Sequence, residues 1–199
     1  DPQVLLHDGW YYFTASVPKY DRLELRRART LGGLPTAEPK VVWRRPASGP
    51  MSGNIWAPEI HFIDGKWYLY FSGGERGKPW FSMRMYVLEN ESPDPLEGTW
   101  TGKGRIRTNW EYFTIDGTTF EHRGVRYFVW TQIDPKVEGS NIYIAKMATP
   151  WSIVGRQVEL SRPEFPWEKM KYAVNEAPAL LVRNGRMFIT YSASATYAN

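Results

Sequence analysis

The chain of 199 residues contains no cysteine. This excludes a disulfide scaffold, a cysteine-ligated zinc site and a cysteine nucleophile. Histidine is scarce too: His7, His61 and His122 each stand just before an expected hairpin turn, so histidine-ligated zinc and a Ser-His-Asp triad have little support. No apolar run approaches the roughly 20 residues that span a bilayer. No P-loop, G-x-G-x-x-G or G-x-S-x-G motif occurs, so we expect neither nucleotide-phosphate binding nor covalent serine chemistry.

Net charge is small, because 25 Lys and Arg are balanced by 21 Asp and Glu, a difference of +4. The densest basic segment, residues 21–29, alternates with apolar residues and contains two acids. It therefore predicts one solvated face of a strand, and we expect neither nucleic acid nor a membrane as a partner.

Aromatic residues are abundant: 10 Trp, 12 Tyr and 9 Phe make up 16% of the chain. They belong to a repeated pattern in which a carboxylate, an apolar stretch and a glycine precede an aromatic-rich alternating run. The glycines are Gly9, Gly65, Gly124 and Gly185, at separations of 56, 59 and 61 residues. Each repeat predicts two strands joined by a tight turn, as the Asp-Gly and Asn-Gly dipeptides favour.

A third strand and a Pro/Gly-containing loop to a fourth strand follow in the first three repeats. Four-stranded antiparallel units in tandem predict an all-β fold, a β-propeller, with a β-sandwich as the alternative. The expected blades span residues 1–48, 49–108, 109–164 and 165–199, the last of them incomplete. These are about three and a half blades of a single, partial propeller domain, and we expect a fifth unit to need further residues beyond Asn199.

Four acids lie on the expected first strands: Asp1, Glu59, Asp116 and Glu176 precede the hairpin glycine by 8, 6, 8 and 9 residues. First strands line the axis of a propeller, and carboxylates are costly there as core residues. Gathered in one pocket, they would have separated pKa values, as a general acid and a general base require. The alternative is that they are strand-end acids paired with nearby arginines.

The segments that carry these acids resemble glycoside hydrolase family 43. The matching motifs are D-P before D-G-W-Y-Y, W-A-P-E at 56–59, I-D-G-T-T-F at 115–120 and N-E-A-P at 175–178. The resemblance implies a five-bladed β-propeller, of which this chain is similar to the first three and a half blades. Within the family, the chain most resembles exo-acting α-1,5-L-arabinofuranosidases of actinobacterial type.

The resemblance implies that Asp1 is the general base, that Glu176 is the general acid, and that Asp116 orients this acid and tunes its pKa. Glu59 matches no catalytic role in the family. Glu176 lies one residue off the glycine register that Asp1 and Asp116 share, and a shift of one residue reverses the facing of a strand side chain. A β-bulge would reconcile the two positions.

Substrate-binding candidates accompany the acids. The resemblance implies that Trp56 shapes the sugar pocket, and Asn54, Asn175 and Thr118 are the further candidates. Trp56 stands just before Ala57-Pro58, where we expect a partly exposed ring.

The function implied is inverting hydrolysis that releases L-arabinofuranose from α-1,5-linked arabinan or arabino-oligosaccharides. A β-xylosidase or another family 43 specificity is one alternative, and a non-catalytic carbohydrate-binding propeller is another. A WD-type interaction propeller is disfavoured, because the repeat exceeds about 40–45 residues and the Trp-Asp dipeptide is absent.

No cofactor is expected to be required. Calcium at the axis would find many oxygen ligands, but no Asp-rich loop argues for it. The expected partner is a carbohydrate, with an appended carbohydrate-binding domain outside this chain as a further expectation. Because polysaccharide lies outside the cell, we expect an extracellular, secreted protein.

Overall fold

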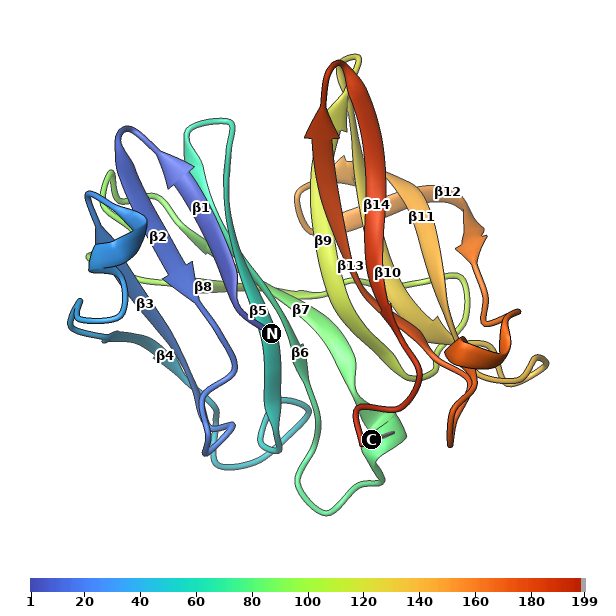
Figure 1. Ribbon diagram of the computed structural model, residues 1–199. Coiled ribbons are helices and arrows are strands. Elements are labelled where there is room, and N and C mark those ends of the chain that lie inside the picture. The colour runs from blue at the N-terminus through green and yellow to red at the C-terminus, as the bar shows by residue number, and fades with distance from the viewer. Residues whose placement is uncertain (198–199) are drawn as a thin grey trace. The chain divides into compact units, whose positions relative to one another are not determined.

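The computed structural model describes residues 1–197 and is all-β (Figure 1). In this part of the chain, helical structure is limited to three short 3-10 turns: η1 (Leu31–Gly33), η2 (Trp80–Ser82) and η3 (Pro166–Glu168). The chain divides into two compact units, the first spanning Asp1–Arg105 and the second beginning at Ile106. Each unit is described by itself.

The first unit holds two four-stranded antiparallel sheets with the strand orders β1-β2-β3-β4 and β5-β6-β7-β8. The first sheet consists of β1 (Gln3–His7), β2 (Trp10–Thr14), β3 (Arg22–Ala28) and β4 (Lys40–Arg44). The second consists of β5 (Ile55–Ile63), β6 (Lys66–Gly73), β7 (Arg84–Asn90) and β8 (Thr101–Arg105).

The second unit holds one four-stranded antiparallel sheet, ordered β9-β10-β11-β12, and one two-stranded sheet of β13 and β14. Their bounds are β9 (Thr114–His122), β10 (Val125–Ile133), β11 (Ser140–Thr149), β12 (Ser152–Ser161), β13 (Asn175–Arg183) and β14 (Arg186–Ala193). Strand order follows chain order in every sheet, as in the blades of a propeller. Three and a half blades of the expected kind are therefore confirmed.

Two-residue turns join the first and second strands of all four sheets. In the first sheet, His7 pairs with Trp10, and the turn residues Asp8 and Gly9 have φ of 48° and 71°. Two successive positive φ values define the type I′ turn, whose twist matches that of the strands. The third hairpin differs from the Asp-Gly and Asn-Gly turns of the others. Arg123 occupies its first turn position, with a left-handed φ of 52°.

Each unit has its own apolar interior. In the first unit, large side chains of β6 such as Trp67, Leu69 and Phe71 join a buried cluster that includes Leu23 and Leu25 of β3. In the second unit, Phe128, Trp130, Ile142 and Tyr143 are buried. Consecutive residues of β6 and of the second half of β10 are buried, so both faces of these strands are covered, unlike the one-sided alternation of a strand that faces water.

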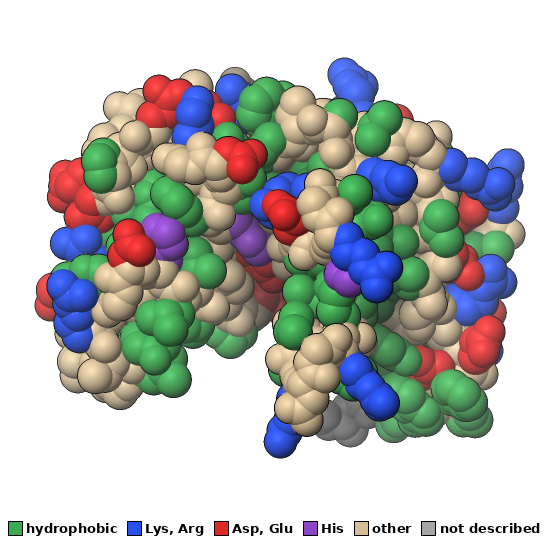
Figure 2. Space-filling model, turned by 90° about the horizontal axis from the view of Figure 1, so that it is seen from above, with side chains coloured by type: hydrophobic (Ala, Val, Ile, Leu, Met, Phe, Trp, Pro, Cys, Tyr) green, Lys and Arg blue, Asp and Glu red, His purple; other side chains and the backbone are tan. Residues whose placement is uncertain are grey.

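The loops that leave the second strand and those that enter the next first strand gather at one end of each unit, opposite the hairpin turns (Figure 1). In Figure 2 histidine side chains are visible on the surface, and acidic and basic side chains are interspersed on it. Among residues 1–197, no helix has the length and apolarity needed to cross a membrane.

Candidate active site

A β-bulge interrupts the first strand of the second, third and fourth sheets at the same distance from the hairpin turn. In each, two residues face one residue of the second strand, and the first of the two has a left-handed backbone. A bulge of this kind bends the strand and redirects the side chains beside it. The left-handed residues are Ala57 (φ 44°), Asp116 (φ 54°) and Ala177 (φ 51°).

The bulges define which residues are equivalent. Asp116 is equivalent to Ala57 and Ala177, whereas Glu176 is equivalent to Trp56, directly before the bulge. The β-bulge that the one-residue offset of Glu176 called for is present, directly after this residue. β9 carries a bulge at the same place as β13, so Glu176 and Asp116 remain one residue apart in register. The two acids are connected instead through a backbone N–H group.

Asp116 and Glu176 lie on strands of the second unit whose bulges are joined by a hydrogen bond. The backbone N–H of Ala177 donates to Oδ2 of Asp116 at 3.0 Å. Glu176, one residue earlier, is half-buried, and burial raises the pKa of its carboxyl group. A raised pKa is the shift expected for a general acid, and its cause here is desolvation of the carboxyl group.

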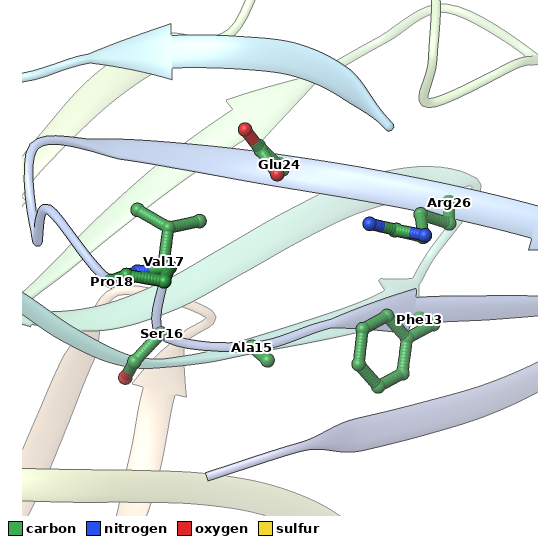
Figure 3. A pocket seen from close by; sticks show the side chains of 7 residues that line it. All are labelled: Phe13, Ala15, Ser16, Val17, Pro18, Glu24 and Arg26. Atoms are coloured by element: carbon green, nitrogen blue, oxygen red, sulfur yellow. The ribbon is translucent and has the colours of Figure 1, made fainter. Parts of the chain in front are cut away.

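The bulge of β5 is held in a similar way within the first unit. The N–H of Ala57 donates to Oγ of Ser16 at 2.8 Å, and Ser16 lies on the connection between β2 and β3 (Figure 3). A strained left-handed alanine costs free energy and persists only where its surroundings fix it. The Ser16 side chain supplies that constraint at Ala57, and the Asp116 side chain supplies it at Ala177.

Asn175 and Thr118 are buried beside the bulges of the second unit. Asn175 donates from Nδ2 to Oγ of Ser161 at 2.7 Å, so it ties the start of β13 to the end of β12. Through this hydrogen bond, Asn175 stabilises the start of β13, the strand that carries Glu176. Sugar contact by these two residues stays a prediction.

Asp1 is exposed and lies two residues before β1. The Gln3 side chain binds both backbone groups of Ile60: its Nε2 donates to the carbonyl at 3.2 Å, and its Oε1 accepts from the N–H at 3.1 Å. Both strands run toward their hairpins (Figure 1), so Asp1 lies toward the bulge end of β5. Asp1 belongs to the first unit and the other two acids to the second, and their convergence stays a prediction.

Glu59 has a partner in its own strand. Its Oε2 lies 2.9 Å from Nε2 of His61. This contact accounts for a carboxylate that the spacing nominated but the family pattern did not. Among residues 1–197, no group of three His, Asp or Glu residues is arranged to hold a metal ion, and the absence of a required cofactor stays an expectation.

Trp56 is partly exposed, as expected, and its ring meets that of Tyr20 edge-on at 6.3 Å. Trp56, Asn54 and residues of the β6–β7 connection line a hollow of about 290 Å³ in the first unit. The N–H of Gly53 donates to Gly74 at 2.8 Å, and that of Gly74 donates to Asn54 at 3.0 Å. These bonds fix the connection beside the predicted sugar-binding residues.

Sequence reasoning missed the β6–β7 connection, which contributes Arg76, Lys78 and Trp80 to this hollow. The available signal was a long connection between two strands, rich in glycine and carrying a tryptophan. Connections of this kind often carry function on a rigid scaffold.

Comparisons with known proteins agree with this arrangement. The family model for glycosyl hydrolases family 43 matches residues 1–199. An extracellular exo-α-(1→5)-L-arabinofuranosidase of Streptomyces chartreusis is 52% identical over 98% of this chain and 60% of its own length. An α-L-arabinofuranosidase 43 of Humicola insolens is 52% identical over 100% of this chain and 42% of its own length.

A crystal structure of an α-L-arabinofuranosidase from Lactobacillus brevis superposes with a TM-score of 0.94 at 48% identity, over 98% of this chain and 63% of that one. The chain thus spans less than two thirds of the length of each of these relatives. The whole-chain match, the blade-like sheets and the motifs around the three acids agree: the chain belongs to glycoside hydrolase family 43.

Proposed function

We propose that this chain forms the larger part of the catalytic domain of an inverting, exo-acting α-L-arabinofuranosidase. Its substrates are α-1,5-linked arabinan and arabino-oligosaccharides, from which it releases L-arabinofuranose. The observation that carries the proposal is the pairing of Glu176, whose pKa burial raises, with Asp116, which binds the next backbone N–H.

Glu176 is the general acid of the proposed reaction. A carboxyl group with a raised pKa keeps its proton at the pH where substrate arrives. As the bond between the anomeric carbon and the glycosidic oxygen breaks, this proton passes to the departing oxygen, which leaves as a hydroxyl group. Asp116 positions the acid, because its bond to Ala177 fixes the bulge that follows Glu176.

Asp1 is the general base. Its carboxylate takes a proton from a water molecule whose oxygen attacks the anomeric carbon from the face opposite the leaving group. The α-linkage therefore yields a β-configured product. An inverting pair needs roughly 6.5–9.5 Å between its carboxyl groups, to leave room for that water.

The choice of arabinofuranose and of an extracellular location rests on the relatives. Two of them at 52% identity, from Streptomyces chartreusis and Streptomyces avermitilis, are named as extracellular exo-α-(1→5)-L-arabinofuranosidases. The similarity covers 98% of this chain for the first relative and 100% for the second.

The test is hydrolysis by the full-length protein of 4-nitrophenyl α-L-arabinofuranoside and 4-nitrophenyl β-D-xyloside, with the product anomer followed by proton NMR. We expect strong preference for the arabinoside and initial formation of the β-anomer. Preference for the xyloside would favour the β-xylosidase alternative. Sugar binding without hydrolysis of either compound would favour the non-catalytic carbohydrate-binding propeller.

A further inference from the structure

The hollow beside Trp56 carries more positive charge than a neutral sugar requires. Its lining includes the cations Arg45, Arg76 and Lys78 and one acid, Glu75. Formal charges therefore sum to +2, or three cations less one acid, around about 290 Å³. The proposed substrate, an arabinan, has no charged group to match them.

Two of these cations have no ion-pair partner. Within residues 1–197, neither the guanidinium group of Arg76 nor the ammonium group of Lys78 forms a salt bridge, and both side chains are exposed. Arg45 is occupied: its Nη1 donates to the carbonyl of Gly53 at 2.8 Å. The charges available to a ligand are therefore those of Arg76 and Lys78.

An aromatic wall stands beside these charges. Trp80 is 57% exposed and meets the ring of Phe81 edge-on at 6.1 Å. Trp56, which also lines the hollow, is partly exposed as well. Aromatic rings offer an apolar face for the C–H groups of a sugar ring, while guanidinium and ammonium groups bind carboxylates by charge-assisted hydrogen bonds.

The backbone fixes this loop in place. Arg76 donates its N–H to Oγ of Ser52 at 3.1 Å, and Ser52 is itself bonded to the carbonyl of Gly49 at 2.7 Å. Gly53 and Gly74 approach so closely that a Cβ on Gly53 would lie 2.9 Å from the Gly74 carbonyl oxygen. The cations are thus carried on a positioned loop beside Asn54 and Trp56.

A second hollow in the same unit provides a contrast. It measures about 140 Å³ and is lined by Glu24 and Arg26 of β3 together with residues of the β2–β3 connection (Figure 3). Glu24 accepts from Nε of Arg22 at 2.6 Å, and Arg26 donates to the carbonyls of Pro35 and Ala37. The charged groups of this second hollow already have partners in the chain, so none of them is available to bind a ligand.

From this difference we infer that the hollow lined by Trp56, Trp80, Arg76 and Lys78 is a subsite for a carboxylate-bearing sugar, a uronate residue of the substrate. The inference rests on the proposed function for its place next to the arabinofuranose pocket. It narrows the substrate class to arabinosides that also carry acidic sugars.

The experiment is calorimetric titration of the full-length protein with trigalacturonic acid, with neutral arabinotriose as reference. We expect trigalacturonic acid to bind, and its affinity to fall as salt is raised from about 20 to 200 mM, since exposed charges are screened. In the double variant R76Q/K78Q, the ratio of uronate to neutral affinity should fall at least about tenfold, because the loss of even one charged hydrogen bond has an effect of this size.

Arg29→Gln is the control for the loss of an exposed cation outside the hollow, at the first hairpin, where Arg29 donates to the carbonyl of Gly9. Its affinity ratio should match that of the wild type, and melting curves verify folding of all variants. Lack of uronate binding, an unchanged ratio in R76Q/K78Q, or equal binding of inorganic sulfate would overturn the subsite. Because binding needs no hydrolysis, failure of the proposed catalysis would appear separately, in the nitrophenyl assay.

Discussion

At the scale of single residues, the proposed acid combines two properties that oppose each other. Glu176 needs burial to keep its proton, and burial of an ionised carboxylate costs folding free energy. Its position before a bulge resolves the conflict by leaving it half-buried, on a strand whose backbone Asp116 holds.

The raised pKa of Glu176 predicts a dependence of stability on pH. Above its usual value of 4.5, the unfolded chain loses this proton before the folded chain does, so stability falls as pH rises toward the folded pKa. Glu176→Gln should therefore melt at a higher temperature than the wild type at neutral pH, and the difference should vanish below the usual carboxyl pKa.

Melting curves of the full-length protein across the pH range check this, with the exposed Glu38→Gln as the control. A constant difference between Glu176→Gln and the wild type at all pH values would contradict it. Deprotonation of Glu176 should also lower the rate of hydrolysis at pH values above its pKa, because the acid then has no proton to donate.

Trp56 supports a second prediction at this scale. Its ring is partly exposed and lines the hollow, so Trp56→Ala should weaken substrate binding by on the order of 1–3 kcal/mol while the protein stays folded. Melting temperature and KM for the arabinoside are measured together. Loss of the folded state in Trp56→Ala would instead assign the ring to the core. Trp67→Ala, which truncates a buried ring, is the reference for such a loss.

At the scale of elements, a buried carboxylate connects the segment around η3 to β14, the strand that pairs with β13. Glu168 is 1% exposed, and its Oε2 accepts the N–H groups of Glu164 at 2.7 Å and Phe165 at 2.8 Å, while Oε1 accepts from the Tyr191 hydroxyl at 3.0 Å. Burial raises the pKa of Glu168, but hydrogen bonds from backbone N–H groups and from side chains together outweigh burial, so the net pKa is lowered. This carboxylate therefore connects η3 with β14.

Glu168→Ala should lower the free energy of unfolding by about 1–3 kcal/mol, because the donors around it lose a charged acceptor. Because the pKa of Glu168 is lowered, its contribution is present above the usual 4.5 and is lost as pH falls below it. Urea unfolding and hydrogen exchange of the β13 amides measure the effect. Tyr191→Phe, which removes one bond, should show a smaller loss, and an equal or larger loss would contradict the assignment.

At the scale of the whole molecule, the proposed base and acid come from different units. Asp1→Ala in the full-length protein should abolish hydrolysis of both natural and nitrophenyl substrates, because no group activates the water. Added azide should restore part of the nitrophenyl reaction and yield a β-glycosyl azide. In Glu176→Ala, substrates with poor leaving groups should suffer by several orders of magnitude and those with good leaving groups far less.

Product analysis by NMR separates the two roles. An α-configured azide product, or a normal rate of Glu176→Ala on arabino-oligosaccharide, would reverse or remove the assignment of acid and base.

Local rules were sufficient to predict the sheets. The Asp8-Gly9, Asp64-Gly65 and Asn184-Gly185 turns and the alternating aromatic strands determine hairpins through contacts between near neighbours, and tandem repetition of hairpins predicts blades. Family motifs then point to the acids, because the residue types at those positions are specific to the chemistry.

What only the tertiary structure decided are the features that depend on contacts between distant segments. A left-handed backbone at Ala177 is unfavourable for alanine and is fixed by Asp116, 61 residues earlier. The burial of Asn175 against Ser161 depends on β12, and the cationic hollow exists because Gly53 binds Gly74. Such contacts join segments that lie far apart in the sequence, on which a local pattern carries no information.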